Sequence, residues 1–241
     1  MIDLIRDHWL FLLIGEYPNG PLGGLAMTLI ITAVSMTLSF PCAVLVALCR
    51  VSRRRVLLWP TTAFVYLMRG TPLLMIVFWI FFGAPVVLGF TLSAFTTIVI
   101  AIVSFQTAYM SEVIRAGIEG LPKGQTEAAM SLGLGYLTTT RKIILPQALY
   151  NVIPGLLNNL TAIFKESSLA YVISLHELTY AGLQVMNHEM SKPFQVFAVL
   201  ACIYFVFCFA LSQTAAWLES RIRRKREENV AIVPRLQVVE G

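Results

Sequence analysis

Lys165 and Glu166 are adjacent residues of opposite charge inside an apolar stretch near 152–174. An ionisable side chain inside a bilayer costs about 2.5–3.5 kcal/mol on insertion scales, so it marks a functional site by default. Neighbouring helical residues point about 100° apart, which prevents these two charges from neutralising each other fully. This stretch therefore predicts a helix that faces a wet cavity or a protein interior. Four further polar residues flank the pair: Asn158, Asn159, Ser167 and Ser168.

Two interpretations of this polar set are open. In the first, the side chains line a path for a zwitterionic solute that carries an ammonium group and carboxylates. In the second, Lys165 and Glu166 form an interhelical or intersubunit ion pair that only stabilises the bundle.

Arg69 is a third charge inside an apolar run, about seven residues and roughly 10 Å from its cytoplasmic end at helical rise. Gly70, Thr71 and Pro72 follow directly. Because proline lacks a backbone donor, we expect the helix to be weakened here. Arg69 and Thr71 then line an inner gate, or Arg69 instead reaches toward the cytoplasmic headgroups.

The composition requires a membrane around these residues. Of the 241 residues, 57% are hydrophobic and only 13% are charged, whereas soluble domains carry roughly 25% charged residues. This balance excludes a soluble enzyme, a disordered chain and a disulfide-stapled module. The four cysteines lie in or beside apolar runs, where they act as small hydrophobic residues.

Five apolar stretches are long enough to span a bilayer, which needs about 20 residues. The prediction is an all-α integral membrane protein with five transmembrane helices. A short amphipathic helix is also expected over 2–14, lying at a membrane face. The five stretches lie near 22–48, 60–82, 92–111, 152–174 and 196–217.

Lys and Arg accumulate in cytoplasmic segments of membrane proteins. Of the 18 here, four follow the first stretch, four lie between the third and fourth, and six follow the fifth. Two fall on the opposite side and two inside spans, so the N-terminus is expected outside and the C-terminus in the cytoplasm. Three roles are open for the basic run 221–226: it binds anionic lipid, forms part of a partner interface, or only anchors the last span.

The predicted organisation has three parts. These are an external segment 1–19, a transmembrane domain 20–220 with a cytoplasmic loop 114–147, and a basic tail 221–241 that ends without structure from Val230.

The loop between the third and fourth stretches carries a spaced pattern. Glu127-Ala128-Ala129 is followed after three residues by Gly133, and after nine more by Ile143-x-Leu145-Pro146. Alanine and glutamate favour a short helix that ends near the glycine. The proline then permits a bend toward the membrane.

This pattern resembles the EAA motif of ABC importer permeases at every fixed position. The segments 68–74, 111–117 and 165–169 also resemble the polar amino-acid branch of these permeases, the histidine, glutamate and glutamine type. The resemblance covers about residues 20–224. It implies a multi-pass permease of the MetI-like fold in the bacterial cytoplasmic (inner) membrane. Its expected solute is a polar L-amino acid, with glutamate, aspartate or glutamine ahead of arginine and histidine.

In that family the EAA segment is a coupling helix that docks on an ATPase subunit. The resemblance therefore implies a second permease subunit of the same or a similar chain, a cytoplasmic ATPase dimer, an outer solute-binding protein and surrounding membrane lipid, but no nucleic acid. No GxxxxGK[ST] phosphate loop occurs in the sequence. ATP and Mg would bind the ATPase, and this chain would be no enzyme and hold no metal or cofactor. Carried over by position, the coupling surface is Glu127, Ala128, Ala129, Gly133, Ile143, Leu145 and Pro146.

A secondary transporter or channel for a small polar solute is the alternative. Such proteins show internal repeats or paired broken helices, and the two halves of this sequence show no self-similarity. The EAA-like loop is the feature that separates the two, because only an ATPase-coupled permease requires it.

Overall fold

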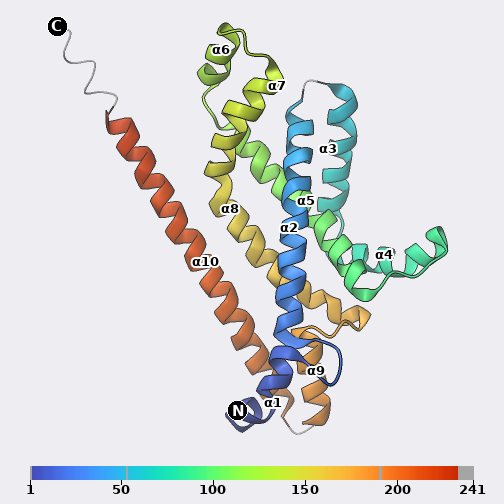
Figure 1. Ribbon diagram of the computed structural model, residues 1–241. Helices are drawn as coiled ribbons and strands as arrows, with labels where there is room; N and C mark the ends of the chain where they lie inside the picture. Colours follow the sequence, from blue (N-terminus) through green and yellow to red (C-terminus); the bar gives the residue numbers. More distant parts are fainter. Residues whose placement is uncertain (1, 53, 190–191, 233–241) are drawn as a thin grey trace.

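The computed structural model describes residues 2–52, 54–189 and 192–232, and in these ranges the regular elements are helices, joined by turns and loops that include two isolated β-bridges. Figure 1 shows the order of the elements. They are α1 (Ile2–Ile14), α2 (Gly24–Val51), α3 (Arg55–Gly70), α4 (Leu73–Leu88), α5 (Ala94–Glu119), α6 (Lys123–Ser131), α7 (Tyr136–Thr139), a π-helical turn (Thr140–Ile144), α8 (Leu145–Glu166), a 3₁₀ segment (Ser167–Ile173), α9 (Leu178–His188) and α10 (Pro193–Ile232).

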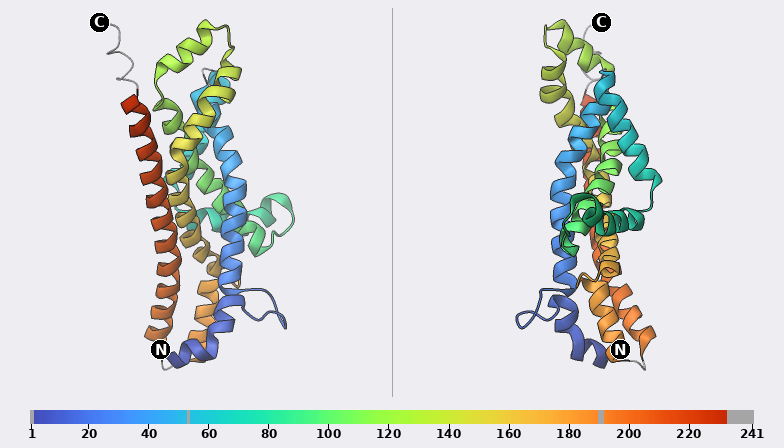
Figure 2. Two further views of the ribbon diagram at one scale, coloured as in Figure 1. Left: turned by 60° about the vertical axis from the view of Figure 1, so that its left-hand side comes forward. Right: turned by 90° about the vertical axis from the view of Figure 1, so that its right-hand side faces the viewer.

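The helices α2, α5 and α8 form the centre of an elongated bundle, and α10 runs beside α8. At one end of the bundle lie α1 and α9, and at the other end lie α6, α7 and the end of α10 (Figure 2). The helix predicted over 2–14 is present as α1. The predicted loop segment and the C-terminal part of the chain therefore share one end, opposite to the N-terminus.

Three described helical segments are long and apolar enough to cross a membrane, namely α2, α5 and residues 193–224 of α10. A fourth crossing results if α3 and α4 count together, although they meet at a bend of 105°. The expected weak point at residues 70–72 is confirmed, but the prediction of one helix over 60–82 is wrong. Pro72 cannot donate to the preceding turn, and Thr71 adopts an extended conformation.

Several helices begin or end at other residues than the predicted spans. α5 continues to Glu119, so the first residues of the predicted loop 114–147 are helical. α8 begins at Leu145 and ends at Glu166, earlier at both ends than the predicted 152–174. α10 continues to Ile232, so the part of the predicted tail over 221–232 is helical, and 233–241 lies outside the described residues.

The predicted bend at Pro146 takes the form of a π-helical turn. Helical backbone runs from Tyr136 to Glu166, with the wider π geometry over Thr140–Ile144. Pro146 stands within the first turn of α8, where the missing N–H costs least. The wider turn accommodates the proline without a break in the chain direction.

Small residues let α5 and α8 approach each other closely. A Cβ added at Gly117 of α5 would collide with the side chain of Val152 and lie 3.3 Å from the carbonyl oxygen of Ala148. Packing of this kind is the main source of helix association in membranes.

We expect Gly117→Ala to destabilise the bundle, because overpacking costs about 1–3 kcal/mol. Gly83→Ala in α4 is the matched control, since a Cβ there meets nothing within 4 Å. Both variants gain the same helix propensity. Thermal unfolding in detergent should show a lower Tm for the first variant only, and equal Tm values would contradict this packing.

Candidate functional site

The polar side chains of α8 form two stripes on different faces. Residues seven apart differ by about 20° around a helix, so they share a face. Asn151, Asn158 and Lys165 make one stripe, and Asn159 and Glu166 make the other. The first faces the seam between α8 and α10, and the second faces α5.

The stripe toward α5 is closed by Gln106, which is only 2% exposed. The Nδ2 of Asn159 donates to the Oε1 of Gln106 over 3.0 Å, and the Nε2 of Gln106 donates to the Oε2 of Glu166 over 2.7 Å. Glu166 is therefore held against α5 by an amide. The sequence analysis missed Gln106, although a glutamine inside the apolar stretch 92–111 was an available signal.

The stripe toward α10 lies open. Lys165 lines a cavity of about 540 Å³ together with Ser168 and side chains of α9 and α10. No ion pair in the described chain involves Lys165. The neighbours Lys165 and Glu166 thus point to different surroundings, as their 100° separation requires. Asn158 lines a second cavity of about 480 Å³, which lies between α8 and the C-terminal half of α10.

The hydroxyl groups predicted beside these residues turn back onto the backbone. Thr71, Ser167 and Ser168 each donate to a carbonyl three or four residues earlier, over 2.7–2.9 Å. Ser167 is also fully buried. These bonds satisfy the hydroxyl hydrogens locally.

Arg69 belongs to a cluster around a single carboxylate, Glu112 of α5. The Nη1 of Arg69 lies 3.5 Å from the Oε1 of Glu112, and its guanidinium lies 5.3 Å from the ring centroid of Tyr109. Arg50 from the end of α2 is ion-paired with the same carboxylate, and Arg115 lies 2.8 Å from it. The cluster joins the ends of α2, α3 and α5, and it leaves Arg69 half exposed.

The predicted coupling residues occupy the end of the bundle that carries α6 and α7 (Figure 1). On α6, Glu127 and Ala128 are exposed and Ala129 is buried. Gly133 follows with φ of +79°, in the left-handed region that favours glycine. This turn reverses the chain between α6 and α7.

The remaining predicted residues stand at the base of this segment. Ile143 and Leu145 are half-buried, whereas Pro146 is exposed. The sequence analysis missed a group of exposed apolar side chains nearby, which we call the apolar loop patch. Leu132 and Leu137 are 81% and 80% exposed. Apolar groups gathered outside the predicted spans indicate a protein contact. The patch consists of Met130, Leu132, Leu134, Tyr136 and Leu137.

The sequence analysis also missed Glu177, a buried carboxylate near the end of the bundle that carries α1. It is fully buried at the start of α9, where its carboxylate accepts from the backbone N–H groups of Thr179 and Tyr180, both over 2.9 Å. The hydroxyls of Tyr204 and Thr28 donate to it from α10 and α2, over 3.2 and 3.4 Å. Burial raises the pKa of Glu177 to about 7. An acidic residue directly before a helix is a known capping signal.

Apolar helices, a central helix with two polar stripes and a helical loop with an exposed apolar patch together define an integral membrane transport subunit. The sequence profile of the family described as "Binding-protein-dependent transport system inner membrane component" matches residues 39–224. The chain belongs to this family, which confirms the resemblance drawn from the loop pattern.

Several relatives and a solved structure are similar to the chain over most of its length. The inner membrane amino-acid ABC transporter permease protein YhdY of Escherichia coli is 38% identical over 85% of this chain, which spans only 57% of that protein. The arginine transport system permease protein ArtQ of Bacillus subtilis is 33% identical over 84% of this chain and 92% of its own length. A crystal structure of an amino acid ABC transporter with histidines superposes with a TM-score of 0.79 at 30% identity, covering 91% of this chain and 97% of that chain.

The raised pKa of Glu177 predicts a pH-dependent stability. Between pH 4.5, the ordinary value, and about 7, the folded state binds more protons than the unfolded state. The free energy of unfolding therefore falls as the pH rises through this window, by on the order of 3 kcal/mol. Glu177→Gln should remove this loss, so that its Tm changes less than that of the wild type between pH 5 and 8. Glu127→Gln, at an exposed glutamate, is the control, and equal pH dependence in Glu177→Gln and wild type would contradict the assignment.

Proposed function

We propose that this chain is the membrane-spanning permease subunit of an ATP-driven importer, and that its solute is a polar L-amino acid delivered by a solute-binding protein. The observation that carries the proposal is the open polar stripe of α8, joined through one continuous helical segment to the apolar loop patch. The names of relatives support the solute class, since they include arginine, glutamine and glutamate/glutamine/aspartate/asparagine transport permeases.

The proposed topology has five crossings of the bacterial cytoplasmic membrane, made by α2, the bent pair α3–α4, α5, α8 and α10. The N-terminus is outside and the C-terminus is in the cytoplasm. The shared end of α6, α7 and the last turns of α10 supports this orientation (Figure 2). Twelve of the fourteen Lys and Arg residues assigned to cytoplasmic segments belong to the described residues near that end.

The proposed solute path follows the seam between α8 and α10. Lys165 supplies an ammonium group for a solute carboxylate in a cavity lined mainly by apolar side chains of α10, where the attraction is stronger than in bulk water. Glu166, Asn159 and Gln106 fix the position of α8 against α5. Arg69, in the last turn of α3, pairs with Glu112 of α5 and holds these two helices together as an inner gate. An acidic or amide solute, glutamate, aspartate or glutamine, fits the unpaired cation best.

The proposed coupling surface includes the predicted residues and the apolar loop patch. Glu127, Ala128 and the patch meet the ATPase, and Gly133 provides the turn that presents them. ATP and Mg bind the ATPase subunits. When these close, they draw the loops of two permease subunits together, and the continuous segment from Tyr136 to Glu166 transmits the movement to the polar stripes.

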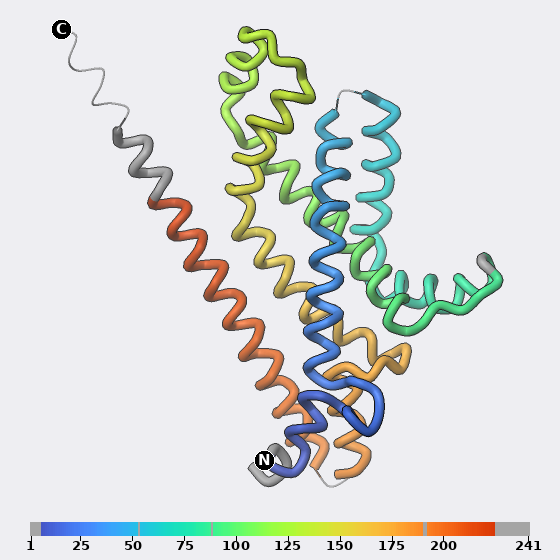
Figure 3. The backbone as a smooth tube through the Cα atoms, in the orientation of Figure 1, coloured from blue at the N-terminus to red at the C-terminus, as the bar shows by residue number. Residues whose placement is uncertain are grey.

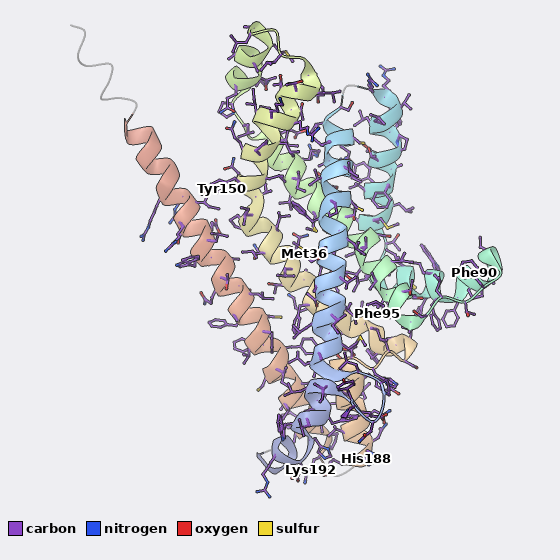
Figure 4. All side chains as sticks on the ribbon, in the orientation of Figure 1. Met36, Phe90, Phe95, Tyr150, His188 and Lys192 are labelled. Carbon is purple, nitrogen blue, oxygen red and sulfur yellow. The ribbon has the colours of Figure 1, made fainter. Side chains whose placement is uncertain are left out.

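A second permease subunit is supported by α4. Figure 3 shows this helix leaving the side of the bundle as an arm. Its base packs with Ile31, which lies seven residues or roughly 10 Å along α2. Phe90, near the tip, stands at a height similar to Met36, midway along α2 (Figure 4). The arm therefore lies within the apolar part of the membrane.

The arm carries backbone that lipid cannot satisfy. Within the described chain, no hydrogen bond joins the N–H groups of Phe90, Thr91 or Leu92 to another group. Irregular backbone at this depth is tolerated only against protein or water. We therefore assign the outer face of the arm to the second permease subunit. Its exposed side chains are Met75, Trp79, Phe82, Val86, Val87 and Phe90.

Coupling is tested with Leu132→Asp in proteoliposomes that contain the ATPase and the binding protein. We expect solute-stimulated ATP hydrolysis to fall about tenfold or more, because a buried unpaired charge weakens the contact by several kcal/mol. Leu132→Met is the conservative control and should retain stimulation. Uptake without any ATPase, or hydrolysis indifferent to the charge, would favour the secondary transporter or channel instead.

The arm contact is tested by cross-linking in a variant without the four native cysteines. Val86→Cys, 85% exposed in the single chain, should give a cross-linked permease dimer with a short thiol reagent. Val56→Cys at the start of α3 is equally exposed, at 84%, and should give none. Mass spectrometry of the product distinguishes a second copy from a similar chain. A functional transporter without the Val86→Cys product would overturn the assignment.

A further inference from the structure

The inner cavity, about 480 Å³ between α8 and the cytoplasmic half of α10, has a polar lining at both walls. Asn151 and Asn158 face it from α8, and Glu219 and Arg223 face it from α10. Ile222, between the two charged residues, is buried and packs the wall. The volume lies within the range of about 300–1,000 Å³ that is typical of small-molecule sites.

Asn158 indicates that this cavity holds water or a polar ligand. It lies thirteen residues past the start of α8, roughly 20 Å along the helix, and its side chain is exposed. In the described chain its carboxamide makes no hydrogen bond. The carboxamide shares the cavity with the charged side chains of Glu219 and Arg223, so it faces a polar environment and not hydrocarbon.

The charges of the cavity match a molecule that bears both signs. Glu219 and Arg223 are four residues apart and therefore lie one turn apart on the same face of α10. Arg223 already interacts within the chain, and its guanidinium has five N–H donors, enough for a second partner. The carboxamides of Asn151 and Asn158 donate and accept on the opposite wall.

We propose that the inner cavity binds a small zwitterion, with Glu219 receiving an ammonium group and Arg223 and the two carboxamides receiving anionic oxygens. Asn151, Asn158 and Lys165 share one face of α8 over fourteen residues, about 21 Å. The inner cavity is thus the cytoplasmic end of the same seam. The ligand is the imported amino acid after it has crossed, which rests on the proposed function, or the ammonium and phosphate of a phosphatidylethanolamine headgroup.

The test measures binding of labelled polar amino acids to the complete permease–ATPase complex in nanodiscs of phosphatidylglycerol, without binding protein or ATP. All variants are made in a parent protein with Lys165→Gln, which removes the proposed binding of the amino acid at the outer end of the seam. Glu219→Gln and Asn158→Leu should each raise the Kd about tenfold. Ser220→Ala, on the same helix and outside the cavity lining, should leave it unchanged.

Nanodiscs with phosphatidylethanolamine separate the two ligands. If the amino acid is the occupant, its Kd stays the same in both lipids. If the headgroup is the occupant, phosphatidylethanolamine abolishes amino-acid binding to the parent, and Glu219→Gln restores it in part. A parent that binds no amino acid and is insensitive to this lipid, or a Glu219→Gln variant that binds as its parent does, overturns the proposal. Uptake by the wild type is measured separately, so that failure of the proposed function is recognised independently.

Discussion

Polar groups inside a membrane need a hydrogen-bond partner or water. This requirement determines the surroundings of the polar side chains on α8. Five amide or charged side chains of this helix, Asn151, Asn158, Asn159, Lys165 and Glu166, divide into two faces. One face is satisfied by protein, through the bonds from Asn159 to Gln106 and from Gln106 to Glu166. The other face has no such partner and lines two cavities. A structural role and the proposed transport role thus lie on one helix, about 100° apart.

The same requirement explains the clusters at the two ends of the bundle. Near the end that carries α1, the carboxylate of Glu177 joins α2, α9 and α10 through hydrogen bonds alone. Near the other end, Glu112 joins α2, α3 and α5 through three arginines. Beside the Glu112 cluster, close contacts at Gly117 and Gly155 hold α5 against α8. The seam between α8 and α10 is joined by apolar packing instead, since Phe164 of α8 stacks on Phe207 and contacts Tyr204 of α10.

The sequence predicted the membrane class, the helix at the N-terminus and the helix that ends before Gly133, because apolar length and capping residues act locally. It did not predict the 105° bend or the course of α4. A proline predicts a weak point, but the angle depends on packing against α5. The pairing of Glu166 with Gln106 was equally out of reach, because it joins residues sixty positions apart. The apolar loop patch could not be predicted, because a sequence does not show which apolar residues are exposed, and single exposed apolar residues are common on protein surfaces.

The central claim is that the α8–α10 seam is wet while the adjacent face of α8 is closed. In a variant without native cysteines, Asn158→Cys and Asn159→Cys place thiols on neighbouring residues of the same helix. The rates at which a small, charged thiol reagent modifies them from the cytoplasmic side test the claim directly. We predict modification at position 158 at least about tenfold faster than at 159, because only the ionised thiol in water reacts well. Equal rates, or faster modification at 159, would contradict the account.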